Sequence, residues 1–314
     1  MTIDQTAYLV FAIVVVISLI FDLGVFSKKS TNVSIRTALY QSLFWVLISL
    51  AFGVFLWWME GEKEALEYLA AYLMEKSLSI DNIFVFILIF TFFGIRKDHV
   101  ARALFIGIIL AIVFRVIFIA VGVVLVERFH WLLYIFGAFL VYTGIKIFMV
   151  RQEDEFDPAD SPVYKFLNRF LPIIHQDIGG KLVVKKDGKR YFTNMFLVII
   201  MLASTDIVFA IDSIPAVFAI VTESKNKELI IYTSNIFAVL GLRALFFLLQ
   251  GAVNRFQYLQ QGIAIVLIFI GLKMFVEIFH IKIPVIISLM FIATSLVGSV
   301  FYSIRITAQN LKDN

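Results

Sequence analysis

The sequence predicts an all-α polytopic membrane protein of about nine transmembrane helices, with its N-terminus outside and its C-terminus inside. Three observations support this fold class. The 314-residue chain is 61% hydrophobic and has a mean hydropathy of +0.95, whereas a soluble domain is about half apolar. Its apolar residues come in runs of about twenty, the length that spans a bilayer as a helix. A pattern of charged residues inside these runs also occurs twice, which predicts two three-helix repeats.

The apolar windows place the helices along the chain. The predicted spans are residues 6–26, 37–59, 66–93, 101–126, 131–150, 194–221, 229–250, 259–279 and 283–307. No basic segment precedes the first window, so we interpret it as a retained span and not as a cleaved signal peptide. Outside the spans, Lys and Arg concentrate in every second connection, and the positive-inside rule then gives the N-out, C-in orientation.

These windows divide the chain into five parts. Residues 1–60 hold the first two helices, and residues 281–314 hold the last helix and the C-terminal tail. Residues 61–150 form the first repeat, helices 3–5, and residues 194–280 form the second, helices 6–8. The connection 151–193 is expected inside the cell, and its stretch "KLVVKKDGKRYF" predicts a small β-hairpin.

The two repeats carry matching charged residues. In each, a pair of carboxylates six residues apart is followed by a polar side chain, an arginine and a lysine. The first repeat has Glu75, Asp81, Asn82, Arg115 and Lys146, and the second has Asp206, Asp212, Ser213, Arg243 and Lys273. Three helices followed by an inside connection must re-enter from the opposite side, so the repeats have inverted topology. Such repeats are typical of secondary transporters, whose site lies at the repeat interface near the midplane.

Charged side chains are costly in this setting, at roughly 2.5–3.5 kcal/mol each at the centre of a span. The carboxylates therefore predict a functional interior, with ion pairs that only lock helix packing as the alternative. The basic residues within the spans are expected to balance the carboxylates: Lys76, Arg115, Lys146, Arg243 and Lys273. Lys146 and Lys273 lie near span ends, from which a lysine can snorkel to the interface.

The spacing of each acid pair also has a geometric consequence. Six residues turn a helix by about 240°, so Glu75 and Asp81 do not share a face of an unbroken helix. Pro215 predicts a break beside Asp212, which would free the carbonyl of Ile211 as a ligand. A packed proline kink without a ligand role is the alternative.

The donor set predicts which ligand the interior would hold. Carboxylate, carbonyl and water oxygens suit Mg²⁺, Ca²⁺ and Mn²⁺, whereas Cu(I) and Zn²⁺ favour thiolate or imidazole. The chain has no cysteine, and its four histidines fall in connections or at helix ends. A hard divalent cation is therefore expected, with protons as a hypothetical coupling ion. No permanent cofactor, ATP-binding loop or nucleic-acid surface is expected.

Four stretches resemble the TerC family of bacterial membrane proteins: "EKSLSIDNIFVF", "STDIVFAIDSIPAVFAI", "YIFGAFLVYTGIKIF" and "SNIFAVLGLRALFFLL". The long central connection makes the Alx-type members the nearest match. The resemblance implies nine spans, the bacterial inner membrane, and export of manganese or its supply to exported enzymes. The conduction site that it implies comprises Glu75, Asp81, Asn82, Asp206, Asp212 and Ser213. Related sequences commonly have a glutamate three residues before Asp206, where this chain has Ala203, so the second repeat offers one carboxylate fewer.

The leading prediction is a secondary transporter that exports Mn²⁺ across the lipid bilayer, and not an enzyme. One alternative is a Na⁺/H⁺-type carboxylate exchanger, which would give no Mn²⁺ phenotype. A second is a metal-delivery or assembly factor that acts with translocation machinery, in which the site residues would matter only beside a partner. A membrane metal hydrolase is least favoured, because its metal would need histidines within the spans.

Overall fold

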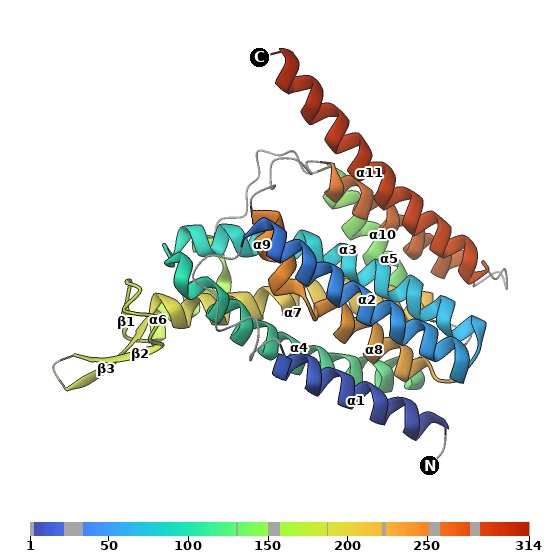
Figure 1. Ribbon diagram of the computed structural model, residues 1–314, viewed down its shortest axis with the longest axis horizontal. Coiled ribbons are helices and arrows are strands. Elements are labelled where there is room, and N and C mark those ends of the chain that lie inside the picture. Colours follow the sequence, from blue (N-terminus) through green and yellow to red (C-terminus); the bar gives the residue numbers. More distant parts are fainter. Residues whose placement is uncertain are drawn as a thin grey trace.

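A computed structural model gives the structure of the chain. It describes residues 3–21, 34–129, 131–149, 158–186, 188–221, 224–250, 258–276 and 283–313. The long helices run side by side in an elongated bundle, and a small sheet projects from one end (Figure 1). The helix α11 lies along one side of the bundle and carries the C-terminus away from it (Figure 1).

Helices make up nearly all of the described chain. They are α1 (Ile3–Phe21), α2 (Ile35–Met59), α3 (Glu62–Phe92), α4 (Lys97–Arg128), α5 (Leu132–Met149), α6 (Pro162–Phe170), α7 (Asn194–Ile220), α8 (Lys227–Val239), α9 (Leu242–Gln250), α10 (Leu259–Val276) and α11 (Val285–Asp313). The strands are β1 (Ile173–Ile174), β2 (Val183–Lys186) and β3 (Lys189–Thr193), in the order β1-β3-β2. The strands β2 and β3 pair antiparallel, as expected for a hairpin in this stretch.

Six helical segments are long and apolar enough to cross a membrane. They are Ile35–Met59, Lys97–Val126, Leu132–Met149, Asn194–Ile220, Lys227–Gln250 and Ile286–Ile306. These segments support the polytopic all-α class. The predicted spans 6–26 and 259–279 correspond to shorter apolar runs, Thr6–Ser18 and Gln260–Val276. The span 66–93 corresponds to α3, whose apolar run is interrupted by charged residues. The count of nine spans therefore stays a prediction.

The helix break expected at Pro215 is absent. The helix α7 runs through this proline from Asn194 to Ile220, because neighbouring helices can accommodate a proline within a membrane span. The interruption lies instead within the predicted span 229–250, where α8 ends at Val239 and α9 begins at Leu242.

Glycine is required at this interruption. Gly241 has φ +82°, and a Cβ on it would lie 2.5 Å from Cγ of Trp45 on α2. Any other amino acid here would carry a Cβ that clashes with the Trp45 ring, and it would have to adopt an unfavourable positive φ. Trp45 itself is buried, so α2 fixes the point at which the span is broken.

Two apolar clusters flank the middle of the bundle. On α4, the members of the two clusters are separated by the stretch from Ile108 to Ile119, and on α7 by the stretch from Leu202 to Ala210. Both stretches hold charged residues that face the interior. The charged residues of these two stretches therefore lie between the two apolar clusters.

The connection between α5 and α7 is fastened to the turn between α3 and α4. The Asp177 carboxylate accepts hydrogen bonds from the amides of Gly180 (3.0 Å) and Arg96 (3.3 Å) and lies 2.6 Å from Nδ1 of His99. Asn194 Nδ2 also donates to the carbonyl of Phe93 at 2.8 Å. These contacts hold the sheet and the start of α7 against the end of the bundle.

Candidate cation site

Two carboxylates at matching positions of the predicted repeats meet in the centre of the bundle. Glu75 comes from α3 and Asp206 from α7, and both bind the guanidinium of Arg115 on α4. Arg115 Nε and Nη2 donate to the two oxygens of Asp206, each at 2.9 Å, while Nη1 donates to Glu75 Oε1. The pairing with Asp206 is thus bidentate, the strongest geometry for these groups.

The whole cluster is shielded from its surroundings. Glu75, Asp206 and Arg115 are all buried, with 0%, 2% and 1% of their surface exposed. Two carboxylates and one guanidinium leave a formal charge of −1 at low dielectric, where charges interact more strongly than in water. The cluster by itself therefore favours a cation over an anion.

Several buried polar atoms on the two helices that carry the carboxylates, α3 and α7, have no hydrogen-bond partner among the described residues. They are Glu75 Oε2, Ser79 Oγ, both amide atoms of Asn82 and Ser213 Oγ. An unsatisfied buried polar group costs about 1–3 kcal/mol, so packing alone gives no reason to keep these atoms buried without partners. They are available as ligands for an ion or for water.

Glu75 and Asn82 lie seven residues apart on α3, close to two full helical turns. Glu75 and Asn82 are both buried on the interior side, as their near-integral number of helical turns predicts. Asp81 and Asp212 belong to α3 and α7, but their side chains lie outside the described part of the structure. The predicted ligand roles of these two carboxylates therefore stay predictions.

The lysines near the site bind helix ends. Lys76 Nζ donates to the carbonyl of Ala238 at 3.1 Å, in the last turn of α8, and Lys273 Nζ donates to the carbonyl of Ala219 at 3.2 Å, in the last turn of α7. Each ammonium thus lies at the negative end of a helix dipole. The expectation that Lys273 snorkels is wrong, because its side chain is buried, whereas Lys146 is exposed.

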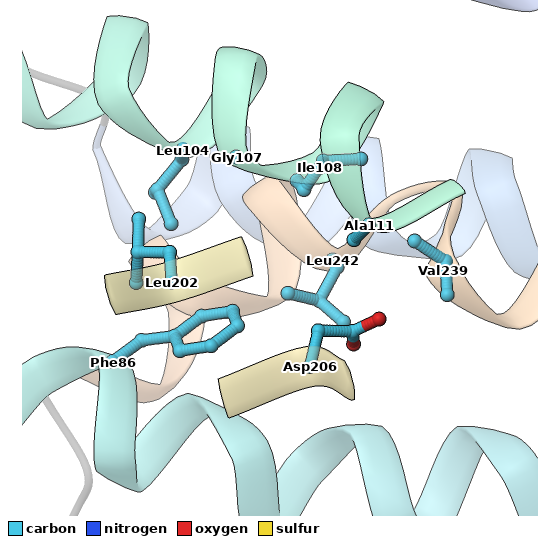
Figure 2. Close-up of a pocket in the computed structure, with 9 residues that line it drawn as sticks. All are labelled: Phe86, Leu104, Gly107, Ile108, Ala111, Leu202, Asp206, Val239 and Leu242. Carbon is cyan, nitrogen blue, oxygen red and sulfur yellow. The ribbon is translucent and has the colours of Figure 1, made fainter. Parts of the chain in front are cut away.

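Arg243 follows the interruption between α8 and α9 and is buried. A small cavity lies beside this interruption, with Asp206 in its wall (Figure 2). Its free volume is about 10 Å³, about enough for one water molecule. The remainder of the wall is apolar: Phe86, Leu104, Gly107, Ile108, Ala111, Leu202, Val239 and Leu242. The carboxylate of Asp206 therefore borders a narrow, mostly apolar space and also binds Arg115.

The donor set fits a hard cation, although the described residues do not form a complete metal centre. No group of three or more His, Asp or Glu side chains within the described ranges is placed to hold a metal ion. Glu75 and Asp206 supply carboxylate oxygens, and Asn82 and Ser213 supply further neutral oxygens. In this arrangement the guanidinium of Arg115 takes the position between the two carboxylates.

Two buried polar residues of the bundle were missed by the sequence analysis. Asn235 on α8 accepts a hydrogen bond from Arg115 Nη1 at 3.2 Å and donates to the carbonyl of Ile231 at 3.0 Å. Glu67 is fully buried on α3 and accepts from the amide of Ser224 at 3.2 Å and from its hydroxyl. The polar run Thr-Ser-Asn at 233–235 within an apolar span was an available signal for the first of them.

The chain matches a known family over most of its length. A family model described as "Integral membrane protein TerC family" matches residues 60–311. An uncharacterized membrane protein of Rickettsia felis is 44% identical over 298 residues, covering 95% of this chain and 97% of the relative. No solved structure matches the chain.

Named relatives are similarly close. Proteins of Salmonella typhi and Escherichia coli (strain K12), whose provisional name is membrane-bound redox modulator Alx, are 41% and 40% identical to this chain. The first similarity covers 89% of this chain and 88% of the relative, and the second covers 90% and 89%. The similarity thus extends over almost the full length of these proteins.

Proposed function

Because this chain belongs to the TerC family of integral membrane proteins, we propose that it is a secondary transporter that exports divalent metal cations, foremost Mn²⁺, across the bacterial inner membrane. One observation carries the proposal: Glu75 and Asp206, at matching positions of the two predicted repeats, meet in the buried centre of the bundle. The cation would be cargo and not a resident cofactor, and no enzyme activity is proposed.

A purely structural role explains the site less well. Apolar residues of similar volume are often as stabilising as a buried ion pair, so stability alone gives little reason to keep three charges in a membrane interior. The cluster also has a net negative charge, and the same two helices carry unpartnered buried oxygens of Glu75, Asn82 and Ser213. Groups in this state are expected where a ligand binds and leaves.

The packing of α5 on α10 supports the inverted repeats. A Cβ on Gly144 of α5 would lie 2.8 Å from the carbonyl oxygen of Ala264 on α10, and a Cβ on Gly271 of α10 would lie 2.6 Å from the carbonyl oxygen of Gly137 on α5. In the repeat alignment Gly144 corresponds to Gly271, and Gly137 to Ala264. The two contacts are therefore related by an exchange of the repeats, as a pseudo-two-fold axis requires.

The choice of Mn²⁺ combines site chemistry with the family. Oxygen donors favour Mg²⁺, Ca²⁺ or Mn²⁺ over softer ions, and the resemblance to the TerC family selects manganese among them. Ala203 removes one carboxylate from the second repeat, which would weaken binding and speed release. Carboxylates in such sites can also exchange protons, and proton coupling is part of the proposal.

The redox name of the Alx relatives is compatible with this function. The chain has no cysteine, so it has no thiol with which to carry out disulfide exchange. A transporter for a redox-active metal would instead alter the redox state of the cell indirectly. In the alternative metal-delivery function, the same site would release its ion only beside a translocation partner.

Mn²⁺ flux into liposomes that contain the purified full-length chain tests the proposal. Wild-type protein should move Mn²⁺, and Glu75→Gln and Asp206→Asn should each abolish most of the flux, whereas the exposed Glu62→Gln on the same helix should not. Asp81→Ala and Asp212→Ala extend the test to the remaining predicted ligands. A wild-type protein that moves Na⁺ against protons but no Mn²⁺ would support the exchanger. Mn²⁺ movement only after addition of membrane extracts would support the delivery factor.

A further inference from the structure

Arg115 occupies the place that a transported cation would take. Its guanidinium binds a carboxylate from each predicted repeat, and it is almost completely buried. A divalent cation and a guanidinium repel each other, and both need the same oxygens. The carboxylate pair can therefore bind metal only after Arg115 has moved away from at least one of its partners.

The predicted repeats indicate which residue could take the place of Arg115 when it moves away from the carboxylates. Exchanging the repeats converts Glu75 into Asp206 and Asp206 into Glu75, so the carboxylate pair is symmetric. Arg115 is not symmetric, because its counterpart in the second repeat is Arg243. In a transporter with inverted repeats, alternating access arises largely as one repeat moves against the other around the fixed site. We take the second access state to be the one in which the two repeats have exchanged their conformations.

The repeats have different conformations in this structure. The helix that carries Arg115, α4, is continuous from Lys97 to Arg128. Its counterpart is divided into α8 and α9, and Arg243 comes two residues after Gly241, at which the chain turns. The cavity beside Asp206 is lined by Val239 and Leu242 from this interruption (Figure 2), so the start of α9 lies close to the carboxylate.

We propose that Arg115 and Arg243 are exchanging tethered cations: Arg115 binds Glu75 and Asp206 in the present state, and Arg243 replaces it in the opposite access state. The metal binds between the two, when neither arginine holds both carboxylates. An arginine always present would prevent the empty site from remaining strongly negative in either state. This inference rests on the transport function proposed above and adds a positioning role for both residues.

A disulfide across the inner part of the bundle can report the present state. A Cβ on Gly107 of α4 would lie 3.3 Å from Cβ of Leu202 on α7, close to the spacing of about 3.5–4.5 Å found in disulfides. The natural chain has no cysteine, so Gly107→Cys with Leu202→Cys gives a single reporter pair. Its rate of oxidation in the full-length protein, measured in liposomes without metal, follows the fraction of molecules in which α4 and α7 touch here.

The two arginines should change this rate in opposite directions. Arg115→Gln removes the bonds to both carboxylates in the present state and should slow cross-linking. Arg243→Gln removes the bonds to both carboxylates in the other state, which in this proposal outweigh the contacts that Arg243 makes in the present state, and it should speed cross-linking. Each change should be about tenfold, the population shift expected when a charge-assisted hydrogen bond is lost from one state only. Arg169→Gln, at an exposed arginine on α6, is the matched control and should leave the rate unchanged.

Conservative variants protect the test against misfolding. Arg115→Lys and Arg243→Lys keep the charge but lose the bidentate geometry, and they should produce smaller shifts with the same opposite signs. Shifts of the same sign, or a response to only one arginine, would overturn the exchange. Because no metal is added, the result is independent of whether the protein carries Mn²⁺, and Mn²⁺ flux in the same liposomes tests the transport function separately.

Discussion

At the scale of single residues, the charge of the Glu75–Arg115–Asp206 cluster determines how each substitution acts. The intact cluster has a formal charge of −1. Removing the charge of Glu75 leaves a neutral bidentate pair. Removing that of Arg115 leaves two buried carboxylates without their counter-ion. The three residues are therefore unequal in their effect on stability, even though they share one set of bonds.

We accordingly expect Arg115→Gln to lower the free energy of unfolding by about 3–5 kcal/mol, the usual cost of breaking a buried ion pair. Glu75→Gln should cost about 1 kcal/mol, in the range of one ordinary hydrogen bond. Thermal unfolding in detergent at neutral pH measures both. Mn²⁺ should raise the unfolding temperature of Arg115→Gln more than that of wild type, because the metal then has no competitor. Equal losses for the two variants would contradict this account of the charges.

The residues of the cluster were predictable from sequence, but their pairing was not. Charged positions inside apolar spans identified Glu75, Asp206 and Arg115, because the cost of burying charge makes such positions rare. That Arg115 would bind both carboxylates, and that Asn235 would join them, depends on the rotation and depth of four helices. Neither quantity is encoded in local periodicity.

At the scale of elements, the interruption between α8 and α9 places Val239 and Leu242 in the wall of the cavity beside Asp206. Sequence analysis placed a break at Pro215, because proline is the strongest local signal for one. The structure has it at Gly241, where a ring from a distant helix enters against the backbone. Glycine alone is a weak signal within a membrane span, and the contact with Trp45 is not visible in the sequence.

Gly241→Ala tests this interruption. The added methyl group would meet Trp45 and force a positive φ on alanine, so we expect a loss of about 1–3 kcal/mol in the free energy of unfolding and a marked loss of flux. Gly298→Ala on α11 is the matched control, because a Cβ there meets nothing within 4 Å. That variant should be neutral or more stable by up to about 1 kcal/mol. Chemical denaturation and Mn²⁺ flux of both variants provide the comparison, and a tolerated Gly241→Ala would show that the interruption is not constrained.

The contacts that attach the connection between α5 and α7 to the turn between α3 and α4 lead to a prediction about pH. Burial disfavours ionisation of Asp177, but hydrogen bonds from His99 and from the amides of Gly180 and Arg96 outweigh it and hold the pKa of Asp177 below its usual value. A carboxyl whose pKa is lower in the folded than in the unfolded protein stabilises the fold. This stabilisation is fully present at a pH above the pKa of the unfolded state, about 3.9, and it is lost as the pH falls through the pKa of the folded state.

Proteolysis measures this attachment. Cleavage within residues 175–193 should be slow at neutral pH and should become faster below about pH 4, as Asp177 takes up a proton. Asp177→Asn should show fast cleavage already at neutral pH, because the amide cannot pair with His99 as an anion does. Lys185→Gln, on the exposed strand β2 of the same connection, is the control. A pH profile identical in wild type and Asp177→Asn would mean that another group holds the connection.

At the scale of the whole molecule, the interface between α5 and α10 joins the two predicted repeats. Both helices approach so closely that a Cβ added to Gly144 or Gly271 would clash with a carbonyl oxygen of the other helix, an approach that small residues permit in membrane bundles. The order of charged residues predicted the repeats from sequence. It could not reveal that the third helices of the two predicted repeats, α5 and α10, pack against each other.

This symmetry can be tested through Gly144 and Gly271. A methyl group at Gly144 would meet Ile268 at 2.7 Å and Ala264 O at 2.8 Å, and one at Gly271 would meet Gly137 O at 2.6 Å and Val141 at 2.8 Å. Gly144→Ala and Gly271→Ala should therefore destabilise the protein by similar amounts, about 1–3 kcal/mol each, the usual cost of overpacking. Because both variants force apart the same pair of helices, the double variant should cost less than the sum of the two single losses.

Unfolding of the two single variants and of the double variant in detergent, with Gly298→Ala as the reference, gives this comparison. A large loss at one glycine and none at the other would contradict equivalent contacts, and it would remove the packing support for inverted repeats while leaving the carboxylate site itself in place.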